Sequence, residues 1–141
     1  MKDGDGILRA AVGGTAVFVC GAAAAAAAGG GPLGVLGAAI AAVLFVAGCV
    51  AYLAGYAGAV QRSRREEIPM AALVFLAGCA PRPVQRLLIG ATVLQTVVAL
   101  GAAALRPFTI VAFVILAPMY GLGLQTLWSA RHGQFPERPA R

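Results

Sequence analysis

The longest stretch without an ionisable side chain is the feature that most constrains this chain. No Asp, Glu, Lys, Arg or His occurs from Ala10 to Gln61, a run of 52 residues. A membrane-spanning helix needs about 20 apolar residues, so this run is too long for one span and suits two. Its middle reads Gly-Gly-Gly-Pro at 29–32. Glycine permits unusual backbone angles and proline cannot continue a preceding helix, so we expect a tight turn there.

Two further stretches of this kind follow, Leu87–Leu105 and Pro107–Ala130. The chain is 60% hydrophobic and 11% charged, whereas a soluble domain is about 45–50% apolar and about 25% charged. We therefore predict an all-α integral membrane four-helix bundle, built from two helical hairpins in a single transmembrane domain. The expected helices are 10–28, 33–60, 84–105 and 107–128, followed by a cytoplasmic tail at 129–141 that is extended and partly disordered.

The distribution of basic residues predicts the orientation. With four spans, the N-terminal tail, the central loop and the C-terminal tail share one side and carry ten of the eleven Lys and Arg residues. Arg106, in the second hairpin turn, is the one on the other side. Basic residues favour the cytoplasmic side of a membrane. We therefore expect a multi-pass protein of the bacterial plasma membrane with both termini in the cytoplasm.

The central loop contains thirteen consecutive apolar residues, Ile68–Ala80. As a helix this segment would be about 20 Å long, too short to cross about 30 Å of hydrocarbon. We expect it to be interfacial, re-entrant or buried beneath the bundle, and burial against protein is favoured because irregular backbone avoids lipid. It is either a structural plug, a docking surface for another membrane protein, or a fifth span. A fifth span would place Arg82 and Arg86 outside and weaken the charge asymmetry.

The flanks of this segment supply the candidate contact residues. Phe75 lies within it, and Arg82 and Arg86 follow about one helical turn apart, so they can share a face. Arg131 and His132 leave the last helix on the same side of the membrane. We predict that these five residues contact a partner protein or anionic lipid headgroups.

A second candidate surface lies on the second span. Gly48, Tyr52, Gly55 and Ala59 follow one another at three- and four-residue spacing on one face. Small residues allow helices in a membrane to approach closely, so this face is expected to pack against a neighbouring helix. The neighbour belongs either to the same bundle or to a second copy of the chain.

Other positions within the spans are expected to be structural. Gln95 and Thr96 are predicted to form interhelical hydrogen bonds, and Pro118 to kink the last helix. Arg106 is expected to extend to the outer interface, and Trp128 to be an interfacial anchor. A water-filled cavity lined by Gln95, Thr96, Tyr52 and Tyr56 would instead favour transport.

The sequence contains no recognisable catalytic or cofactor-binding motif, and we predict neither function. The three cysteines contain no CxxC pair and are interpreted as packing residues, and a single histidine, His132, supplies neither a haem ligand pair nor a zinc site. Glu66 and Glu67 are adjacent in sequence and cannot flank a substrate as acid and base, so they are expected to pair with Arg62 or Arg64. No span contains an ionisable residue, which argues against proton-coupled transport. Basic residues without a face of stacking aromatics argue against nucleic acid binding.

These observations favour a non-enzymatic accessory or scaffold subunit that packs against another membrane protein. The alternatives are an oligomeric small transporter or channel subunit, and a membrane enzyme of unrecognised type built around the cytoplasmic arginines.

The strings "SRREE", "APRPVQR" and "LWSARHGQFPERP" resemble those of small multi-span actinobacterial membrane proteins, from Ser63 to the C-terminal tail. This resemblance implies a plasma-membrane location and no particular activity. In its topology alone, the chain is also similar to the accessory protein I of bacterial ATP synthase operons.

Overall fold

The computed structural model describes residues 4–138. Four of its helical stretches are long and apolar enough to cross a membrane, which confirms the predicted all-α fold with four candidate spans. Lys2, Arg141 and the end of the expected tail (139–141) lie outside the described residues. The elements are α1 (Asp5–Ala28), α2 (Gly31–Arg62), α3 (Met70–Phe75), α4 (Arg82–Leu105), the 3₁₀-helix η1 (Ile110–Leu116) and α5 (Pro118–His132).

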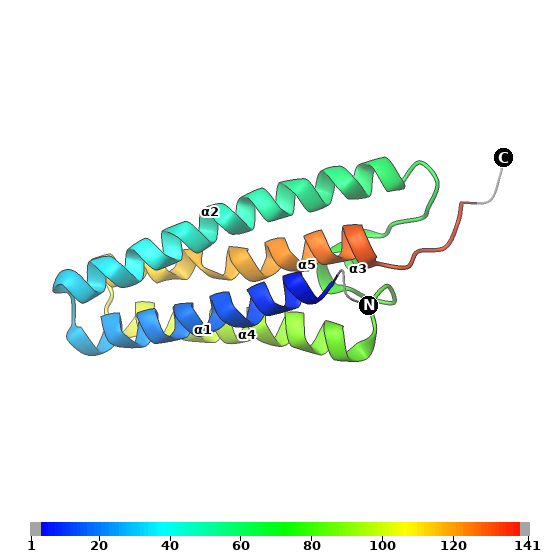
Figure 1. The fold of residues 1–141 in the computed structure, drawn as a ribbon. Coiled ribbons are helices and arrows are strands. Elements are labelled where there is room, and N and C mark those ends of the chain that lie inside the picture. Colours follow the sequence, from blue (N-terminus) through cyan, green and yellow to red (C-terminus); the bar gives the residue numbers. More distant parts are fainter. Residues whose placement is uncertain (1–3, 139–141) are drawn as a thin grey trace.

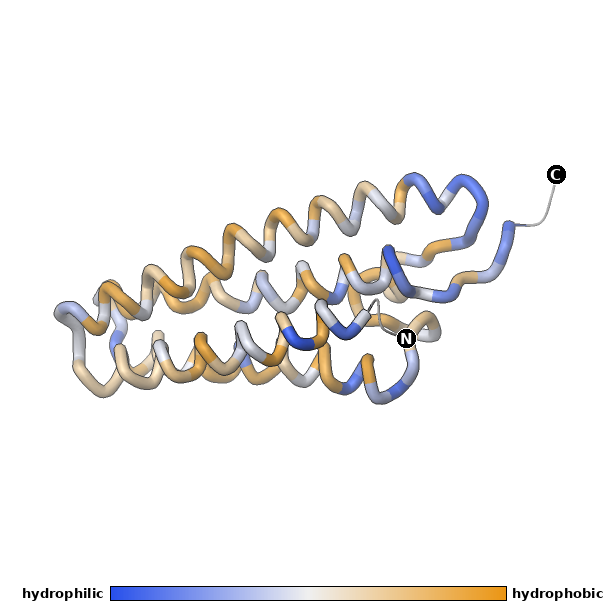
Figure 2. Tube along the Cα trace, in the orientation of Figure 1, coloured by the Kyte–Doolittle hydropathy of each residue, from blue (hydrophilic) through white to orange (hydrophobic). Residues whose placement is uncertain are grey.

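The spans form two hairpins that pack side by side (Figure 1). α2 contacts α1, η1 and α5, and α4 contacts the same three elements, so α2 and α4 lie at opposite corners of the bundle. The two hairpin turns lie at one end. The start of α1, the short helix α3 and the C-terminal segment lie at the other end (Figure 1). Hydrophilic residues gather at this second end, which we call the charged end (Figure 2).

The first hairpin turn follows the expected glycine chemistry. Gly29, Gly30 and Gly31 all have positive φ angles, of 70°, 124° and 65°, a conformation that other residues rarely adopt. α2 begins at the third glycine with a proline in its first turn, where a missing N–H costs nothing. Arg106, from the other hairpin turn, donates from its Nε to the carbonyl of Ala26 at 3.1 Å. The side chain expected at the outer interface therefore caps the C-terminus of α1 and joins the two turns.

Helices α2 and α5 approach each other at glycines. A Cβ added at Gly48 would lie 2.5 Å from the carbonyl oxygen of Met119, and one at Gly55 would lie 2.7 Å from the amide nitrogen of Leu127. From the other side, a Cβ at Gly123 would collide with the backbone of Gly48. Ala59 is buried one turn beyond Gly55. The small face of α2 therefore packs within the bundle, against the backbone of α5.

The fourth span is not one continuous α-helix from 107 to 128. Phe108 has a positive φ of 63°, η1 begins at Ile110, and the α-helix starts only at Pro118. Proline has no N–H to donate to the preceding turn, and the junction uses tighter bonds, from Ala117 N–H to Val114 O and from Tyr120 N–H to Ala117 O. The break expected at Pro118 is thus a change of helix type.

A set of polar side chains crosses the middle of the bundle. Gln95 is fully buried and donates from its Nε2 to Thr15 Oγ1 at 2.7 Å. Gln125 donates from its Nε2 to Thr92 Oγ1 at 2.6 Å. These contacts join α1 to α4 and α4 to α5, each contributing about 0.6 kcal/mol if typical of membrane bundles. Gly121 has no room for a Cβ, which would collide with the Thr92 hydroxyl.

We predict that Gly55→Leu destabilises the bundle. The new side chain must displace backbone atoms of α5, and overpacking costs about 1–3 kcal/mol in unfolding free energy. Gly101→Leu on α4 is the matched control, because nothing lies within 4 Å of a Cβ there. Thermal melting in detergent should show a lower midpoint for Gly55→Leu alone. Equal midpoints for the two variants would contradict the close α2–α5 contact.

Candidate functional site

The central loop closes the charged end of the bundle. Ala72, Leu73 and Leu76 of the segment Ile68–Ala80 are buried, and the helix within the segment, α3, packs against α5. Leu76 ends α3 with a positive φ of 54°, and Gly78 follows with 73°. These angles turn the chain back before α4 begins. The segment lies against the bundle, as the shortness of the apolar run predicted.

The opposite face of the same segment is open. Phe75 is 60% exposed and Met70 is 58% exposed. Both side chains belong to α3, at the charged end of the molecule and outside the four spans. An apolar side chain in that position meets water, the membrane interface or a partner protein. The exposed face of α3 is therefore the apolar part of the candidate site.

The C-terminal segment docks onto the central loop. Glu67 N–H donates to Pro136 O, and Arg138 N–H donates to Arg65 O, each at 2.9 Å. These bonds make an antiparallel bridge between Glu66 and Glu137. Gln134 N–H donates to Cys79 O at 3.0 Å. Residues 133–138 are extended, as expected, but they are held by backbone pairing, so the expectation of partial disorder is wrong for this part of the tail.

Arg62, the last residue of α2, fixes this arrangement. Its guanidinium donates to Ala130 O at 2.9 Å and to Gly133 O at 3.0 Å, at the C-terminal end of α5. It also pairs with Glu66 one turn later, at 2.6 Å, as predicted for this glutamate. The same guanidinium lies 5.2 Å from the ring centroid of Phe135. One side chain thus holds together α2, α5, the central loop and the C-terminal segment.

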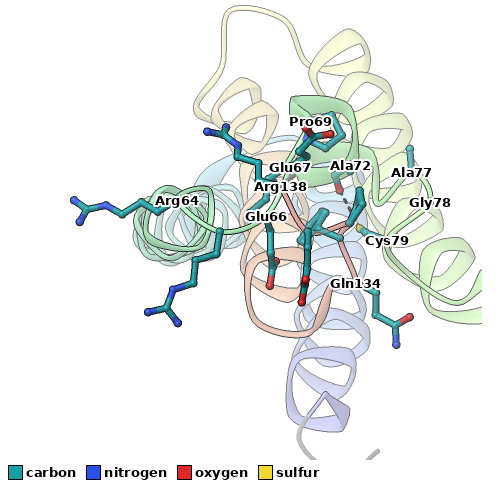
Figure 3. Close-up of a pocket in the computed structure, with 15 residues that line it drawn as sticks. Arg64, Glu66, Glu67, Pro69, Ala72, Ala77, Gly78, Cys79, Gln134 and Arg138 are labelled. Atoms are coloured by element: carbon teal, nitrogen blue, oxygen red, sulfur yellow. Dashed lines mark hydrogen bonds between the residues drawn. The ribbon is translucent and has the colours of Figure 1, made fainter. Parts of the chain in front are cut away.

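An open cavity of about 1580 Å³ lies between the central loop and the C-terminal segment (Figure 3). Three arginines and three glutamates line it, together with an apolar portion that includes Pro69, Ala72 and Phe135. Arg64 extends away from the other labelled side chains (Figure 3). The charges balance in number, so the cavity has no formal preference for an anion or a cation.

Cys79 lies at the inner side of this cavity. Its thiol is 3.3 Å from the carbonyl oxygen of Ala72 and 3.4 Å from the hydroxyl of Ser129. Ser129 donates to the same carbonyl at 3.0 Å. The thiol is buried and hydrogen-bonded in a packed contact between the loop and α5, which fits the packing role expected for this cysteine. Among residues 4–138, no group of three or more potential metal ligands is present.

The predicted contact residues lie at the charged end but form no joint network. Arg82 and Arg86 are exposed on the first turns of α4, and Arg131 is exposed near the end of α5. His132 is half-buried, with its ring 5.6 Å from that of Trp128. Within the described part of the chain, no hydrogen bond or ion pair joins any two of these four side chains. Their convergence therefore stays a prediction.

Trp128 is not an interfacial anchor. Its side chain is only 6% exposed and packs with Ala11, Leu88 and Leu124 in the core beneath the charged end. The indole nitrogen is buried without a hydrogen-bond partner among residues 4–138. The position of this residue near a helix end suggested an anchor at the membrane interface, whereas its side chain points into the core.

The sequence pattern predicted an ion pair for Arg62 but not its bonds to α5, and it predicted no docking of the C-terminal segment. Two signals were present. The apolar pair Phe135–Pro136 is unusual in a polar tail, and Arg62 is the first charge after 52 uncharged residues. No protein-family model matches the chain, and neither a curated protein nor a solved structure matches it. A function is therefore inferred from the residues of this chain alone.

We predict that Arg62→Gln loosens the C-terminal segment. Hydrogen bonds to a charged group contribute about 1.5–3 kcal/mol, so losing them should speed amide exchange at the segment by about tenfold or more. The reporters are the amides of Glu67 and Arg138, which form the bridge. Arg64→Gln is the control because Arg64 is exposed. Unchanged exchange at both amides in Arg62→Gln would show that the segment docks independently of this arginine.

Proposed function

We propose that this chain is a small non-enzymatic accessory or scaffold subunit that packs against another membrane protein. The single observation that carries the proposal is the two-sided character of α3. One face, Ala72 and Leu73, is buried against the bundle, while Phe75 and Met70 on the other face are open at the charged end. The buried face of α3 already closes the charged end of the bundle. The open apolar face is available for a partner.

Arg82 and Arg86 adjoin this surface in sequence and supply its polar flank. Fully buried aromatic anchors surrounded by polar groups dominate many protein interfaces. In this proposal Phe75 is the anchor, and Arg82 meets a carboxylate of the partner. Arg131 and His132, at the end of α5, extend the same surface.

The interior of the bundle supports this class over transport. The Gln95 amide nitrogen donates to Thr15 inside the bundle, whereas Tyr56 is 46% exposed on the outside of α2. One cavity lies at the charged end, and an apolar groove lies on the outer side of α1 and α4. A transporter or an enzyme would need its polar groups directed into a shared cavity.

We propose that the membrane is the bacterial plasma membrane and that the charged end faces the cytoplasm. The central loop, the C-terminal segment and the first turns of α1 and α4 share this end (Figure 1), so among residues 4–138 eight arginines lie at this end and Arg106 lies at the other. Such an asymmetry is the usual determinant of orientation.

The interaction surface is tested by crosslinking in native membranes. Phe75→Asp and Arg82→Glu should each abolish recovery of the crosslinked partner, because a carboxylate cannot occupy an apolar pocket or pair with another carboxylate. Gln61→Asp and Arg64→Glu are matched controls with the same charge changes at exposed sites of the same end. All four variants are first checked for membrane insertion. Unchanged crosslinks in both test variants would reduce the segment to a structural plug and remove the main support for an accessory subunit.

Reporter fusions test the orientation. A reporter placed after Arg141 should be active in the cytoplasm, and one inserted within Gly29–Pro32 should be active in the periplasm. A periplasmic signal from the C-terminal fusion would refute the proposed topology. This test does not depend on the identity of any partner.

A further inference from the structure

An apolar groove runs between α1 and α4 on the outside of the bundle. Its volume is about 500 Å³. Small residues are prominent in its lining, Ala16 and Cys20 from α1 and Gly90 and Ala91 from α4, and Val12 and Leu87 lie toward the charged end. The groove is unfilled because no side chain extends from Gly90, where nothing lies within 4 Å of a would-be Cβ. In a membrane, such a groove faces hydrocarbon.

The length of the groove matches that of one lipid acyl chain. Its α1 side runs from Val12 to Cys20, which is about 12 Å along the helix axis. That distance fits within one leaflet, about half of a 30 Å hydrocarbon core. The acyl chains of one leaflet, about 15 Å deep, are long enough to fill such a groove from the charged end. On α1 the groove is centred on Ala16, near the middle of the helix, and on α4 it begins at Leu87, five residues after the helix starts at Arg82.

The mouth of the groove carries positive charge. Arg9 lies three residues before Val12 and seven before Ala16, and Arg86 lies four residues before Gly90, so each is on the groove side of its helix. Both residues are exposed, and so is Arg82, one turn closer to the membrane surface. α1 and α4 begin at the same end of the bundle (Figure 1). Side chains on a helix lean toward its N-terminus, so all three arginines lean toward the headgroup layer.

These cations are not used by the protein itself within the described residues. The ion pair among residues 4–138 is between Arg62 and Glu66, and none of these three arginines has a side-chain hydrogen bond there. The carboxylate on the same first turns is Asp5, which is exposed. Three arginines against one aspartate leave an excess of positive charge. The N-termini of α1 and α4 add the positive ends of two helix dipoles.

We propose that this groove binds one anionic phospholipid of the leaflet at the charged end. One acyl chain lies along Ala16, Cys20 and Gly90, and the phosphate is held between Arg9 and Arg86, with Arg82 above it. The hydrocarbon restores the dispersion contacts that an empty groove lacks. The arginines select an anionic headgroup over a zwitterionic one. This site shares Arg82 and Arg86 with the proposed partner surface, but Phe75 and α3 take no part in it. Lipid retention and partner crosslinking are therefore tested with different variants.

Native mass spectrometry of the full chain in mild detergent tests the site. The protein is titrated with dioleoylphosphatidylglycerol and, separately, with dioleoylphosphatidylcholine. We expect one tightly retained phosphatidylglycerol and no comparable retention of phosphatidylcholine. Arg9→Gln combined with Arg86→Gln should weaken retention about 25-fold, at about fivefold for each arginine near a membrane surface. The control is Arg64→Gln combined with Arg65→Gln, which removes the same charge from exposed sites of the same end.

The groove itself is tested with a pair of leucine substitutions. Gly90→Leu adds a side chain at the groove, and Gly101→Leu adds the same side chain elsewhere on α4; at both positions nothing lies within 4 Å of the added Cβ. Only Gly90→Leu should lose the retained lipid. Equal retention in both leucine variants, equal weakening in both double arginine variants, or equal retention of phosphatidylcholine would each overturn the proposal. So would full displacement of the lipid by soluble glycerophosphoglycerol, since that would show a headgroup site without an acyl chain.

Discussion

The backbone contact between α2 and α5 is the interaction on which the rest of this structure depends. In a membrane, apolar side chains gain little by leaving lipid for protein, so helices are held by close packing and interhelical hydrogen bonds. Gly48, Gly55 and Gly123 remove the side chains that would keep the two backbones apart. This contact brings the end of α5 under the last turn of α2. Arg62 can then reach the carbonyls of Ala130 and Gly133.

The arrangement at the charged end follows from that contact. Once Arg62 has joined α2 to α5, the chain leaving α5 passes next to the loop leaving α2, and the two pair through Glu67 and Arg138. α3 fills the remaining space with Ala72 and Leu73. A single glycine-mediated crossing thus determines where the loops meet. The candidate partner surface on α3 is presented by this assembly rather than by a span.

Spans, turns and the buried loop segment could be predicted because their signals are local. Each signal predicts the structure of the segment in which it occurs. These signals are the length of an uncharged run, a glycine triplet before proline, and thirteen consecutive apolar residues. The face of a helix that meets protein depends instead on its neighbours. Gly55 indicated a packing face but did not distinguish α5 from a second copy. Trp128 lies on the same face as Gly121 and Leu124, and that spacing was compatible with burial as well as with an anchor.

Contacts between segments that are far apart in the sequence could not be predicted from such local signals. The docking of the C-terminal segment uses backbone groups of Arg65, Glu67 and Cys79, and a backbone N–H or C=O leaves no trace in composition or charge pattern. The same holds for a hydrogen bond made by a side chain, that of Arg106. Its position after α4 predicted an interfacial cation, but its acceptor is the carbonyl of Ala26, 80 positions earlier in the chain. Only the packing of the two hairpins brings donor and acceptor together.

The arginines of this chain divide by the helix end at which they lie. Arg106 and Arg62 each bind carbonyls at the C-terminal end of another helix, α1 and α5, where a cation is favoured by the helix dipole. Arg82 lies in the first turn of α4, where the helix dipole disfavours a cation by about 0.3–1 kcal/mol. Arg86 and Arg9 lie one turn into α4 and α1, where among residues 4–138 no such carbonyl group is available to them. Arginines that hold the bundle together thus lie where the protein stabilises them. Those at the helix starts gain their stabilisation from an anion outside the chain, and the headgroup layer of the membrane is the nearest source of one.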